Sequence, residues 1–332
     1  MLAKHKGRFL RGAPFLAQPA GQRSGFRKGT AMSEHSTTTT TASPTRTEAE
    51  LRALMARAVR EVRETNPLAP SITNTVTQSF VANAQLAVGG SAAMVYLPDE
   101  GECVAALGGA VYINLGTLMP VYEQTVPATA RACAAAATPW VLDPVGVGIG
   151  SLRTRLIEAV RENPPTILRG NASEIIAVAD LWGLGGNSAD GASGDGPRGV
   201  DSTDSVDAAE RAAVACARFT GGAVAVSGAT DLVTDGVQVA RLSGGSSLMT
   251  CITGSGCSLG GVAAVYACVA DPFVAALTAT AVYNLAGLRA AEACSGSGSF
   301  QVAFLDALYN LTAEEVAEAP LILTGASGTQ AL

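Results

Sequence analysis

The stretch that decides the fold is residues 140–171, WVLDPVGVGIGSLRTRLIEAVRENPPTILRGN. Its first apolar run stops at Asp143 and Pro144, and its last apolar run stops at Arg169 and Asn171. Between the two runs, TRLIEAVREN is a helical stretch. Two short apolar strands joined by a helix are the unit from which parallel β-sheets are built.

The same alternation continues on both sides of this stretch. The apolar runs AVYIN and GAVAVSG end in turn residues, at Asn114 and at Ser227, and TVPATARACAAAA is a further helical stretch. Near the start of the chain, the apolar residues of EAELRALMARAVREVRET recur with a helical period: Leu51, Leu54, Met55 and Val59. The sequence therefore predicts an α/β fold with a mostly parallel central sheet flanked by helices on both faces.

The first part of the chain differs in composition from the rest. Every lysine and histidine falls within the first 35 residues: Lys4, Lys6, Lys28, His5 and His35. This segment runs into the Thr-rich stretch STTTTTASPT and has no periodic apolar pattern. We predict a disordered basic and Thr-rich extension over residues 1–45 and a single domain over residues 46–332. A transit peptide, or an over-extended start with Met32 as the true initiator, are alternatives for the extension.

The absence of lysine and histidine from residues 46–332 excludes several kinds of catalysis. A Ser-His-Asp triad, an HExxH zinc site, a Schiff-base lysine and a Walker lysine all need residues that this part of the sequence lacks. Residues 256–260 match the G-x-S-x-G pattern of a hydrolase, but Ser258 has no histidine base. A hydrolase that uses Ser258 or Cys257 is therefore disfavoured.

Composition also limits partners and location. The formal net charge of −6 provides no basic patch for nucleic acid or an anionic membrane. The seven cysteines are odd in number and contain no CxxC pair, which is typical of reduced thiols in the cytoplasm. The apolar stretch 259–288 is interrupted by Asp271 and Pro272, which favours two buried helices over a membrane span. We expect a cytoplasmic protein that binds neither nucleic acid nor membrane.

Polar residues stand where the predicted strands end, namely at Asn114, Asp143, Arg169 and Ser227. Any one of them could be a turn or cap residue. Because parallel strands bring their carboxyl ends to one edge of a sheet, we expect the four side chains to converge there. Ligands of such sheets bind at that edge, so the pattern favours a ligand site.

A glycine-rich stretch, TGSGCSLGG at residues 253–261, opens an apolar helix. Backbone N–H groups and the positive end of the helix dipole attract phosphate at such a helix start, and glycines let the backbone approach the anion. Cys257 lies in the first turn, where the dipole favours the thiolate, so it could accept a proton from an attacking hydroxyl or pack beside that hydroxyl. A glycine-rich packing turn is the structural alternative.

Two acidic residues and an arginine extend this pattern. Asp143 follows a strand in LDPVG, and Glu174 lies in RGNASEI, five residues beyond Arg169. Carboxylate oxygens suit Mg²⁺ bound to nucleotide phosphates, although Glu174 also suits a helix N-terminus. Arg169 can grip phosphate oxygens with its planar guanidinium, or form a surface ion pair. An anion-binding helix start, an arginine and two acids are the components of phosphoryl transfer.

Together these motifs resemble the hydroxyethylthiazole kinases of thiamine salvage, which belong to the ribokinase-like superfamily. The resemblance runs from about Asn66 to Val316 and rests on DPVG-x-G, RGNASE and TG-x-GC in this order. Further matching pieces are SITNTVTQSFVANAQLAVGGSAAM, INLGTL, VAVSGATDLVTDG and GSGSF. The implied reaction is the ATP- and Mg²⁺-dependent phosphorylation of the hydroxyl of 4-methyl-5-(2-hydroxyethyl)thiazole, which gives the thiazole phosphate for thiamine diphosphate.

The resemblance also implies roles for individual residues. By motif, these are ATP binding for Arg169 and Ser227, metal binding for Asp143 and Glu174, thiazole binding for Met94, Gly254, Asn74 and Val76, and catalysis for Cys257. Cys257 takes the place where many ribokinase-like enzymes have a catalytic aspartate. Members of the family are typically homotrimers with the thiazole pocket at the subunit interface, so residues 71–94 would face a neighbour.

The chain departs from the family pattern in places. GGSAAM replaces GASPxM before Met94, Ser227 stands where threonine is common, residues 149–154 replace A-T-P-F/Y-R-T, and the polar excursion at residues 183–204 is longer than usual. The GGSAAM change leaves the selectivity for the acceptor open. Two further interpretations remain: a ribokinase-like kinase of another small alcohol, and a catalytically inactive nucleotide-binding homologue.

Overall fold

The computed structural model describes residues 45–107, 109–185 and 206–326. All but the last residue of the predicted extension over residues 1–45 lies outside the described part of the chain, as does most of the excursion at residues 183–204. The division into this extension and one domain over residues 46–332 therefore stays a prediction.

Within the described residues, the centre of the fold is a nine-stranded sheet with the strand order β2-β1-β3-β4-β5-β6-β7-β8-β9. The strands from β2 to β6 are parallel, and β7, β8 and β9 add an antiparallel edge. The predicted mostly parallel sheet is confirmed. The strands are β1 (Leu68–Ile72), β2 (Ser91–Met94), β3 (Val111–Asn114), β4 (Trp140–Asp143), β5 (Ile167–Asn171), β6 (Ala223–Ser227), β7 (Asp231–Thr234), β8 (Gln238–Leu242) and β9 (Leu321–Gly325).

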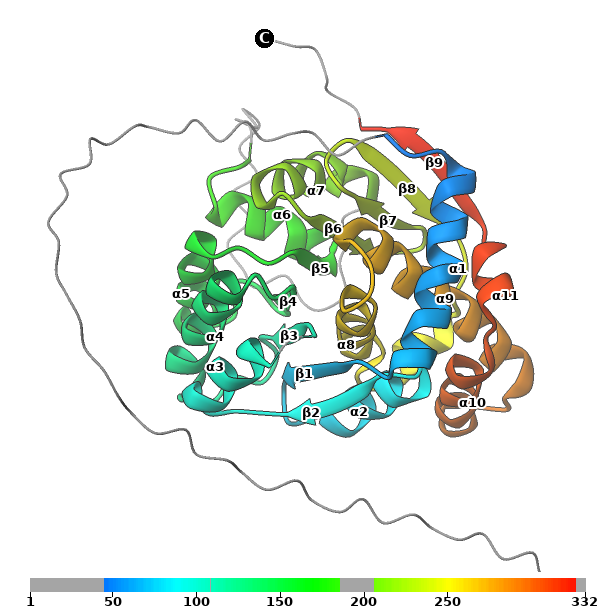
Figure 1. Ribbon diagram of the computed structural model, residues 1–332, viewed down its shortest axis with the longest axis horizontal. Helices are drawn as coiled ribbons and strands as arrows, with labels where there is room; N and C mark the ends of the chain where they lie inside the picture. The colour runs from blue at the N-terminus through cyan, green and yellow to red at the C-terminus, as the bar shows by residue number, and fades with distance from the viewer. Residues whose placement is uncertain (1–44, 108, 186–205, 327–332) are drawn as a thin grey trace, which may run out of the picture. The chain divides into compact units, whose positions relative to one another are not determined.

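Helices cover both faces of the sheet, as predicted (Figure 1). One face carries α3 (Pro98–Ala106), α4 (Tyr122–Ala136), α5 (Ser151–Ala159), α6 (Ala172–Leu181) and α7 (Val206–Thr220). The other face carries α1 (Glu48–Thr65), α2 (Gln78–Ala87), α8 (Ser255–Ala267), α9 (Pro272–Ala293), α10 (Ser297–Asn310) and α11 (Ala313–Ala317). Two short 3₁₀ turns, η1 (Val160–Glu162) and η2 (Ser247–Cys251), complete the described elements.

The central strands are buried on both sides, which explains their continuous apolar runs. In β4, Val141 packs in the hydrophobic core that contains α8 and α9, whereas Leu142 packs in the opposite core. Ile167 and Leu168 divide in the same way in β5. Because successive side chains of a strand point to opposite faces, an all-apolar strand needs a helix layer on each side of the sheet.

The two buried helices predicted within residues 259–288 are α8 and α9. They are separated at Asp271, whose side chain accepts a hydrogen bond of 3.2 Å from the backbone N–H of Val274 and so caps α9. In the described part of the chain, α9 alone is long and apolar enough to cross a membrane, yet 83% of its apolar window is buried inside the protein. Burial in the core accounts for its composition.

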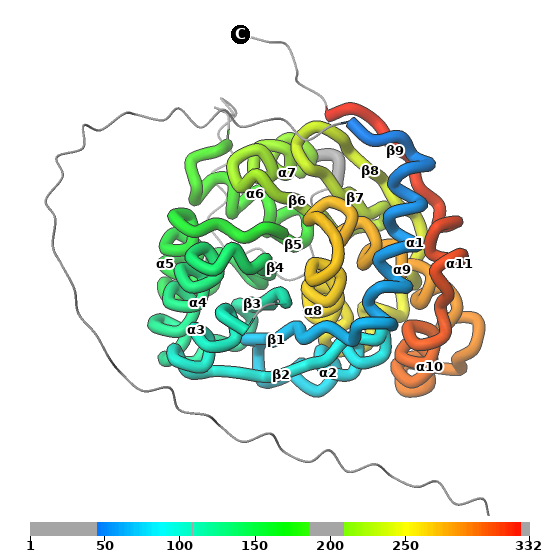
Figure 2. The backbone as a smooth tube through the Cα atoms, in the orientation of Figure 1, coloured from blue at the N-terminus to red at the C-terminus, as the bar shows by residue number. Residues whose placement is uncertain are grey.

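The helix α8 lies beside β1, β3 and β4 (Figure 2). Its first turn lines a cavity together with Asp143 and Arg169, at the carboxyl edge of the sheet. Small residues make this approach possible. A Cβ added at Gly260 would lie 2.4 Å from Cε2 of Tyr112, and one added at Gly261 would lie 2.8 Å from Cγ1 of Val81. Gly260 therefore allows the helix to approach the sheet at Tyr112, and Gly261 allows it to approach α2 at Val81.

Candidate active site

The polar residues at the ends of β3, β4, β5 and β6 lie together, as expected. Asn114 Nδ2 donates to Asp143 Oδ2 at 3.1 Å, and Arg169 donates to the same oxygen at 3.2 Å. The other terminal nitrogen of Arg169 donates to Ser227 Oγ at 2.9 Å. One hydrogen-bonded chain thus joins the four strand ends.

Tyr112 also belongs to this network, although it stands inside an apolar run of the sequence and not at a strand end. Its hydroxyl donates to Asp143 Oδ2 at 3.0 Å and accepts from Asn114 Nδ2 at 2.9 Å. Burial, and then the nearby Asp143 carboxylate, raise the pKa of Tyr112 well above its ordinary value. Tyr112 stands two residues before Asn114, and residues two apart share one face of a strand, so this spacing could have identified it.

Asp143 is fully buried at the centre of the network. Its Oδ1 atom has no hydrogen-bond partner among the described residues, and Asp143 lines a cavity. Burial raises the pKa of this carboxyl to about 6; Arg169 acts to lower the pKa and Glu174 acts to raise it. A buried carboxylate oxygen without a partner suits a cation or a donor brought by a ligand.

Glu174 is held by the backbone on both of its carboxylate oxygens. Oε1 accepts from Gly146 N–H at 2.9 Å, and Oε2 accepts from Asn171 N–H at 2.9 Å. The Asn171 side chain in turn accepts from Glu174 N–H at 2.9 Å, which forms a capping box at the start of α6. Glu174 therefore joins the turn after β4 to the start of α6, and each of its oxygens keeps a lone pair for a further partner in the cavity that it lines.

Arg169 is buried, and its guanidinium lies between the Asp143 carboxylate and the first turn of α8. Burial alone would lower its pKa, but the carboxylates of Asp143 and Glu174 outweigh burial and raise it. Nε of Arg169 has no partner within the described structure. On its other side lies Gly256 in the first turn of α8, where an added Cβ would be 3.3 Å from the guanidinium. The arginine thus faces the glycine-rich helix start.

The first turn of α8 has the geometry expected of an anion site. Gly254 is its N-cap residue, with φ 89°, and makes no side-chain cap. A Cβ there would lie 2.9 Å from Cγ2 of Thr77, so both the backbone conformation and the close packing require glycine. The first N–H groups of the helix are consequently left for a ligand.

Cys257 lies beside the polar network. Asn74, which is buried, donates to Asn114 Oδ1 at 2.9 Å and approaches Cys257 Sγ at 3.6 Å. The expectation that the helix start favours the thiolate is wrong: burial, and then the Asp143 carboxylate, raise the pKa of Cys257, while Arg169 lowers it less. Cys257 is therefore a neutral thiol at neutral pH.

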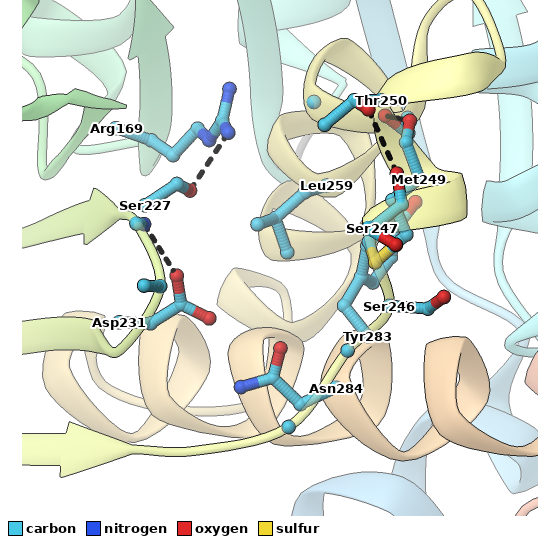
Figure 3. A pocket seen from close by; sticks show the side chains of 16 residues that line it. Arg169, Ser227, Asp231, Ser246, Ser247, Met249, Thr250, Leu259, Tyr283 and Asn284 are labelled. Atoms are coloured by element: carbon cyan, nitrogen blue, oxygen red, sulfur yellow. Dashed lines mark hydrogen bonds between the residues drawn. The ribbon is translucent and has the colours of Figure 1, made fainter. Parts of the chain in front are cut away.

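Two adjoining cavities meet at this helix start. One, of about 510 Å³, is lined by Asp143, Glu174 and residues 249–257, and the other, of about 590 Å³, extends toward β7 and α9. They share Arg169 and Gly256. Figure 3 shows the second cavity, with the guanidinium of Arg169 directed into it. The arginine thus stands where two ligands could meet.

Some of the predicted site residues are not brought into these cavities. Met94 ends β2 and is half-buried, and Val76 is 67% exposed; neither lines either cavity. Gly254 does line the smaller cavity. Ser258 is buried with its hydroxyl donating to Ser255 O at 3.0 Å. A hydrolase role for Ser258 has no support in the described residues.

Comparison with known proteins places these observations in a family. Residues 59–314 match the hydroxyethylthiazole kinase family. The chain is 51% identical over 298 residues to the hydroxyethylthiazole kinase of Bifidobacterium longum, covering 86% of this chain and 95% of that protein. It is 45% identical over 253 residues to the hydroxyethylthiazole kinase of Cereibacter sphaeroides, covering 76% of this chain and 92% of that protein.

Solved structures agree with the sequence relatives. The structure of a hydroxyethylthiazole kinase protein from Pyrococcus horikoshii matches 82% of this chain and 99% of its own, with a TM-score of 0.72 and 29% identity. A pyridoxal kinase from Staphylococcus aureus in complex with AMP-PCP and pyridoxal matches 78% of this chain and 98% of its own, with a TM-score of 0.54 and 14% identity, which shows a shared ribokinase-like fold. By sequence and by fold, this chain belongs to the hydroxyethylthiazole kinase family.

Proposed function

We propose that this protein transfers the γ-phosphoryl group of ATP, with Mg²⁺, to the hydroxyl of 4-methyl-5-(2-hydroxyethyl)thiazole. The product, a thiazole phosphate, would serve the synthesis of thiamine diphosphate. The observation that carries the proposal is the meeting of two cavities between Arg169 and the first turn of α8, in a chain whose relatives are named for this reaction. The larger cavity suits the nucleotide, and the smaller cavity suits the acceptor.

Arg169 and Ser227 hold the phosphates of ATP in this proposal. Arg169 is buried and fixed by Asp143 and Ser227, so its charge and orientation are already set before the nucleotide binds. The backbone N–H groups of residues 254–257 face the same region and stabilise the charge on the transferred group. Because residues 46–332 contain no lysine or histidine, these groups bind the phosphates in place of the lysine ammonium group that other phosphate sites use.

The residues present fit a magnesium ion at one position. Asp143 offers a buried oxygen, Oδ1, that has no partner among the described residues, and Asp143 lines the smaller cavity. Glu174 lines the same cavity, and each of its oxygens accepts one backbone hydrogen bond and keeps a second lone pair, so Glu174 would hold the ion directly or through a water. When bound there, Mg²⁺ would neutralise part of the triphosphate charge.

The acceptor alcohol binds in the smaller cavity, next to Gly254 and Cys257. Asn74 lines neither cavity and acts through Cys257, whose Sγ its Nδ2 approaches at 3.6 Å. A neutral thiol is a weak base, but the transition state of phosphoryl transfer is loose and the hydroxyl loses its proton late. We therefore assign Cys257 a place beside the attacking hydroxyl, where the thiol packs against the hydroxyl and orients it, and the proton of the hydroxyl leaves to an oxygen of the transferred phosphoryl group. Positioning then supplies most of the catalysis.

We also propose a homotrimer in which the thiazole pocket lies between subunits. The support is that Val76 is largely exposed and Met94 half-exposed, while neither residue lines a cavity of its own chain. In such an assembly both residues would contact a thiazole at the boundary with a neighbouring subunit. We place the enzyme in the cytoplasm, where its substrates and reduced thiols are found; all seven cysteines are free.

A coupled assay of ADP release with the thiazole alcohol and Mg²⁺ tests the proposal. Turnover that depends on the alcohol supports it. Turnover only with another small alcohol, such as a pyrimidine or a sugar, would instead make the protein a different ribokinase-like kinase. Thermal stabilisation by ATP without turnover on any alcohol would identify an inactive nucleotide-binding homologue.

A further inference from the structure

The larger cavity, which holds the nucleotide in the proposed function, has two chemically different ends (Figure 3). Arg169 and Ser227 lie at one end, where positive charge and a hydroxyl meet. Asp231 and Asn284 lie at the other end, where a carboxylate faces an amide. The cationic end suits phosphates, and the acidic end suits a group that carries hydrogen-bond donors.

Asp231 is held in place by its own turn. It is the first residue of β7, and its Oδ1 accepts from the backbone N–H of Gly228 at 2.9 Å. Its other carboxylate oxygen is directed into the cavity (Figure 3). The turn therefore fixes the carboxylate, whose second oxygen lies on the side of Asn284, so that a ligand hydroxyl can bridge the two side chains.

Asn284 supplies an independent observation. It lies on α9 and is only 7% exposed, and its amide interacts with the Asp231 carboxylate, yet its Nδ2 makes no hydrogen bond of ordinary geometry within the described residues. Gly244 and Gly245 pack against it, and Gly245 N–H donates to the Asn284 carbonyl at 3.0 Å, so the residue is fixed. A buried, unpaired donor is costly, and a ligand acceptor in the cavity that it lines would satisfy it.

The order of groups in a nucleoside triphosphate identifies what reaches this end. Arg169 hydrogen-bonds Ser227, and the next residue, Gly228, hydrogen-bonds Asp231, so only a short distance separates the phosphate end from the carboxylate. The first donor-bearing group after the phosphates is the ribose, and the base lies beyond it. A ribose hydroxyl both donates and accepts, which matches a carboxylate beside an amide donor.

We propose that Asp231 and Asn284 bind the ribose hydroxyls of the nucleotide and make the enzyme select ribonucleotides over deoxyribonucleotides. This inference rests on the proposed function in that the larger cavity holds the nucleotide. It gives a role to Asp231, which lies within the matching piece VAVSGATDLVTDG, and to Asn284, which lies outside the matching pieces.

Isothermal titration calorimetry without any acceptor tests the inference. The unmodified protein is titrated with ATP, 2′-deoxy-ATP, 3′-deoxy-ATP and inosine triphosphate, each with Mg²⁺. We expect at least one deoxy compound to bind about tenfold or more weakly than ATP, which is the loss of a hydrogen bond to a charged group. Inosine triphosphate, which lacks the amine of adenine but keeps both hydroxyls, should bind within about threefold of ATP.

Asp231→Asn is the informative variant, because its side-chain oxygen can still accept from Gly228 N–H while the oxygen in the cavity is replaced by a donor. Asp235→Asn is the matched control at the other end of β7, where Oδ1 of Asp235 accepts from Val237 and Gln238 N–H. Asp231→Asn should weaken ATP about tenfold and leave the deoxy compound unchanged, so that the two bind equally. Asn284→Ala should reduce the difference in affinity between ATP and the deoxy compound, and Asp235→Asn should leave that difference unchanged.

The outcomes separate the inference from the proposed function. Equal binding of ATP and both deoxy compounds by the unmodified protein would overturn the inference alone. Binding of inosine triphosphate to the unmodified protein about tenfold or more weakly than ATP, with that difference lost in Asp231→Asn, would overturn it too, because it would place the base at the carboxylate. Absence of nucleotide binding by the unmodified protein would overturn the proposed function.

Discussion

At the scale of single residues, the site depends on charges that are buried together. Arg169 and Asp143 form an ion pair of 3.2 Å in which the aspartate is fully buried. Such a pair is costly to break, because the remaining charge stays buried without its partner. The pair therefore couples the protonation of the carboxylate to the position of the guanidinium.

Replacement of Arg169 separates its charge from its shape. Arg169→Lys keeps a positive charge near Asp143 but loses the planar fork, so we expect the KM for ATP to rise about tenfold with an unchanged fold. Arg169→Ala should raise the KM by about 100-fold or more and lower the melting temperature as well, because Asp143 is left unpaired. Steady-state kinetics and thermal unfolding measure the two effects. An unchanged KM for ATP in both variants would show that the phosphates bind elsewhere.

The pKa of Asp143 predicts a pH dependence with a definite sign. Because the pKa is raised to about 6 from 3.8, the carboxyl is neutral below about pH 6 in the free enzyme and cannot serve as an anionic ligand. We expect kcat/KM for ATP to fall roughly tenfold per pH unit below about pH 6. Protonation favours the folded state, so the contribution of Asp143 to stability is largest below pH 3.8 and is lost as the pH rises through about 6.

Asp143→Asn is the control for this profile. The variant has no carboxyl to titrate, so its low residual kcat/KM should not show the inflection near pH 6, and the linked change in unfolding free energy should disappear from the pH titration. An inflection that persists in the variant would assign the profile to another group.

At the scale of elements, the glycines of α8 connect the helix to the polar network. Gly260 packs against Tyr112, whose hydroxyl holds Asp143. The spacing of glycines in this helix therefore controls how near the anion-binding turn lies to the strand ends.

Gly260→Ala tests this connection. The added Cβ would lie 2.4 Å from the ring of fully buried Tyr112, so the helix or the ring must move. We expect a loss of about 1–3 kcal/mol in unfolding free energy, together with a lower kcat. Gly298→Ala, in α10, is the matched control, because nothing lies within 4 Å of its added Cβ, and its stability should change by less than about 1 kcal/mol. Equal stability of the two variants would argue against tight packing at Gly260.

At the scale of the whole molecule, the site is incomplete in one chain if the thiazole pocket lies between subunits. The sheet positions Met94 at the end of an edge strand, β2, and leaves Val76 in a turn that solvent reaches. An assembly would explain why an apolar residue is 67% exposed beside the candidate site.

Val76→Glu tests the assembly. In an isolated chain this exposed substitution should change stability by less than about 0.5 kcal/mol. In a homotrimer with Val76 at the interface, it should shift the assembly toward monomers in analytical ultracentrifugation and raise the KM for the thiazole alcohol, while nucleotide binding stays close to normal. A protein that sediments as a monomer before substitution would rule out this arrangement.

The fold could be predicted in its main features because its signals are local. Short apolar runs, each followed by turn residues, identify β3, β4, β5 and β6, and they also indicate which polar residues meet at the carboxyl edge. The antiparallel edge of β7, β8 and β9 was not predicted, since β9 lies far along the chain from its partner β8.

The sequence by itself determined the order of the motifs, the lack of lysine and histidine in the body, and therefore the kind of chemistry that is possible. Only the tertiary structure decided that burial raises the pKa of the Cys257 thiol, that backbone N–H groups donate to the Glu174 carboxylate, and that Asp231 and Asn284 share one cavity. The physical reason is that local conformation follows from neighbouring residues, whereas burial, charge coupling and unpaired donors depend on which distant side chains the fold brings within a few ångströms.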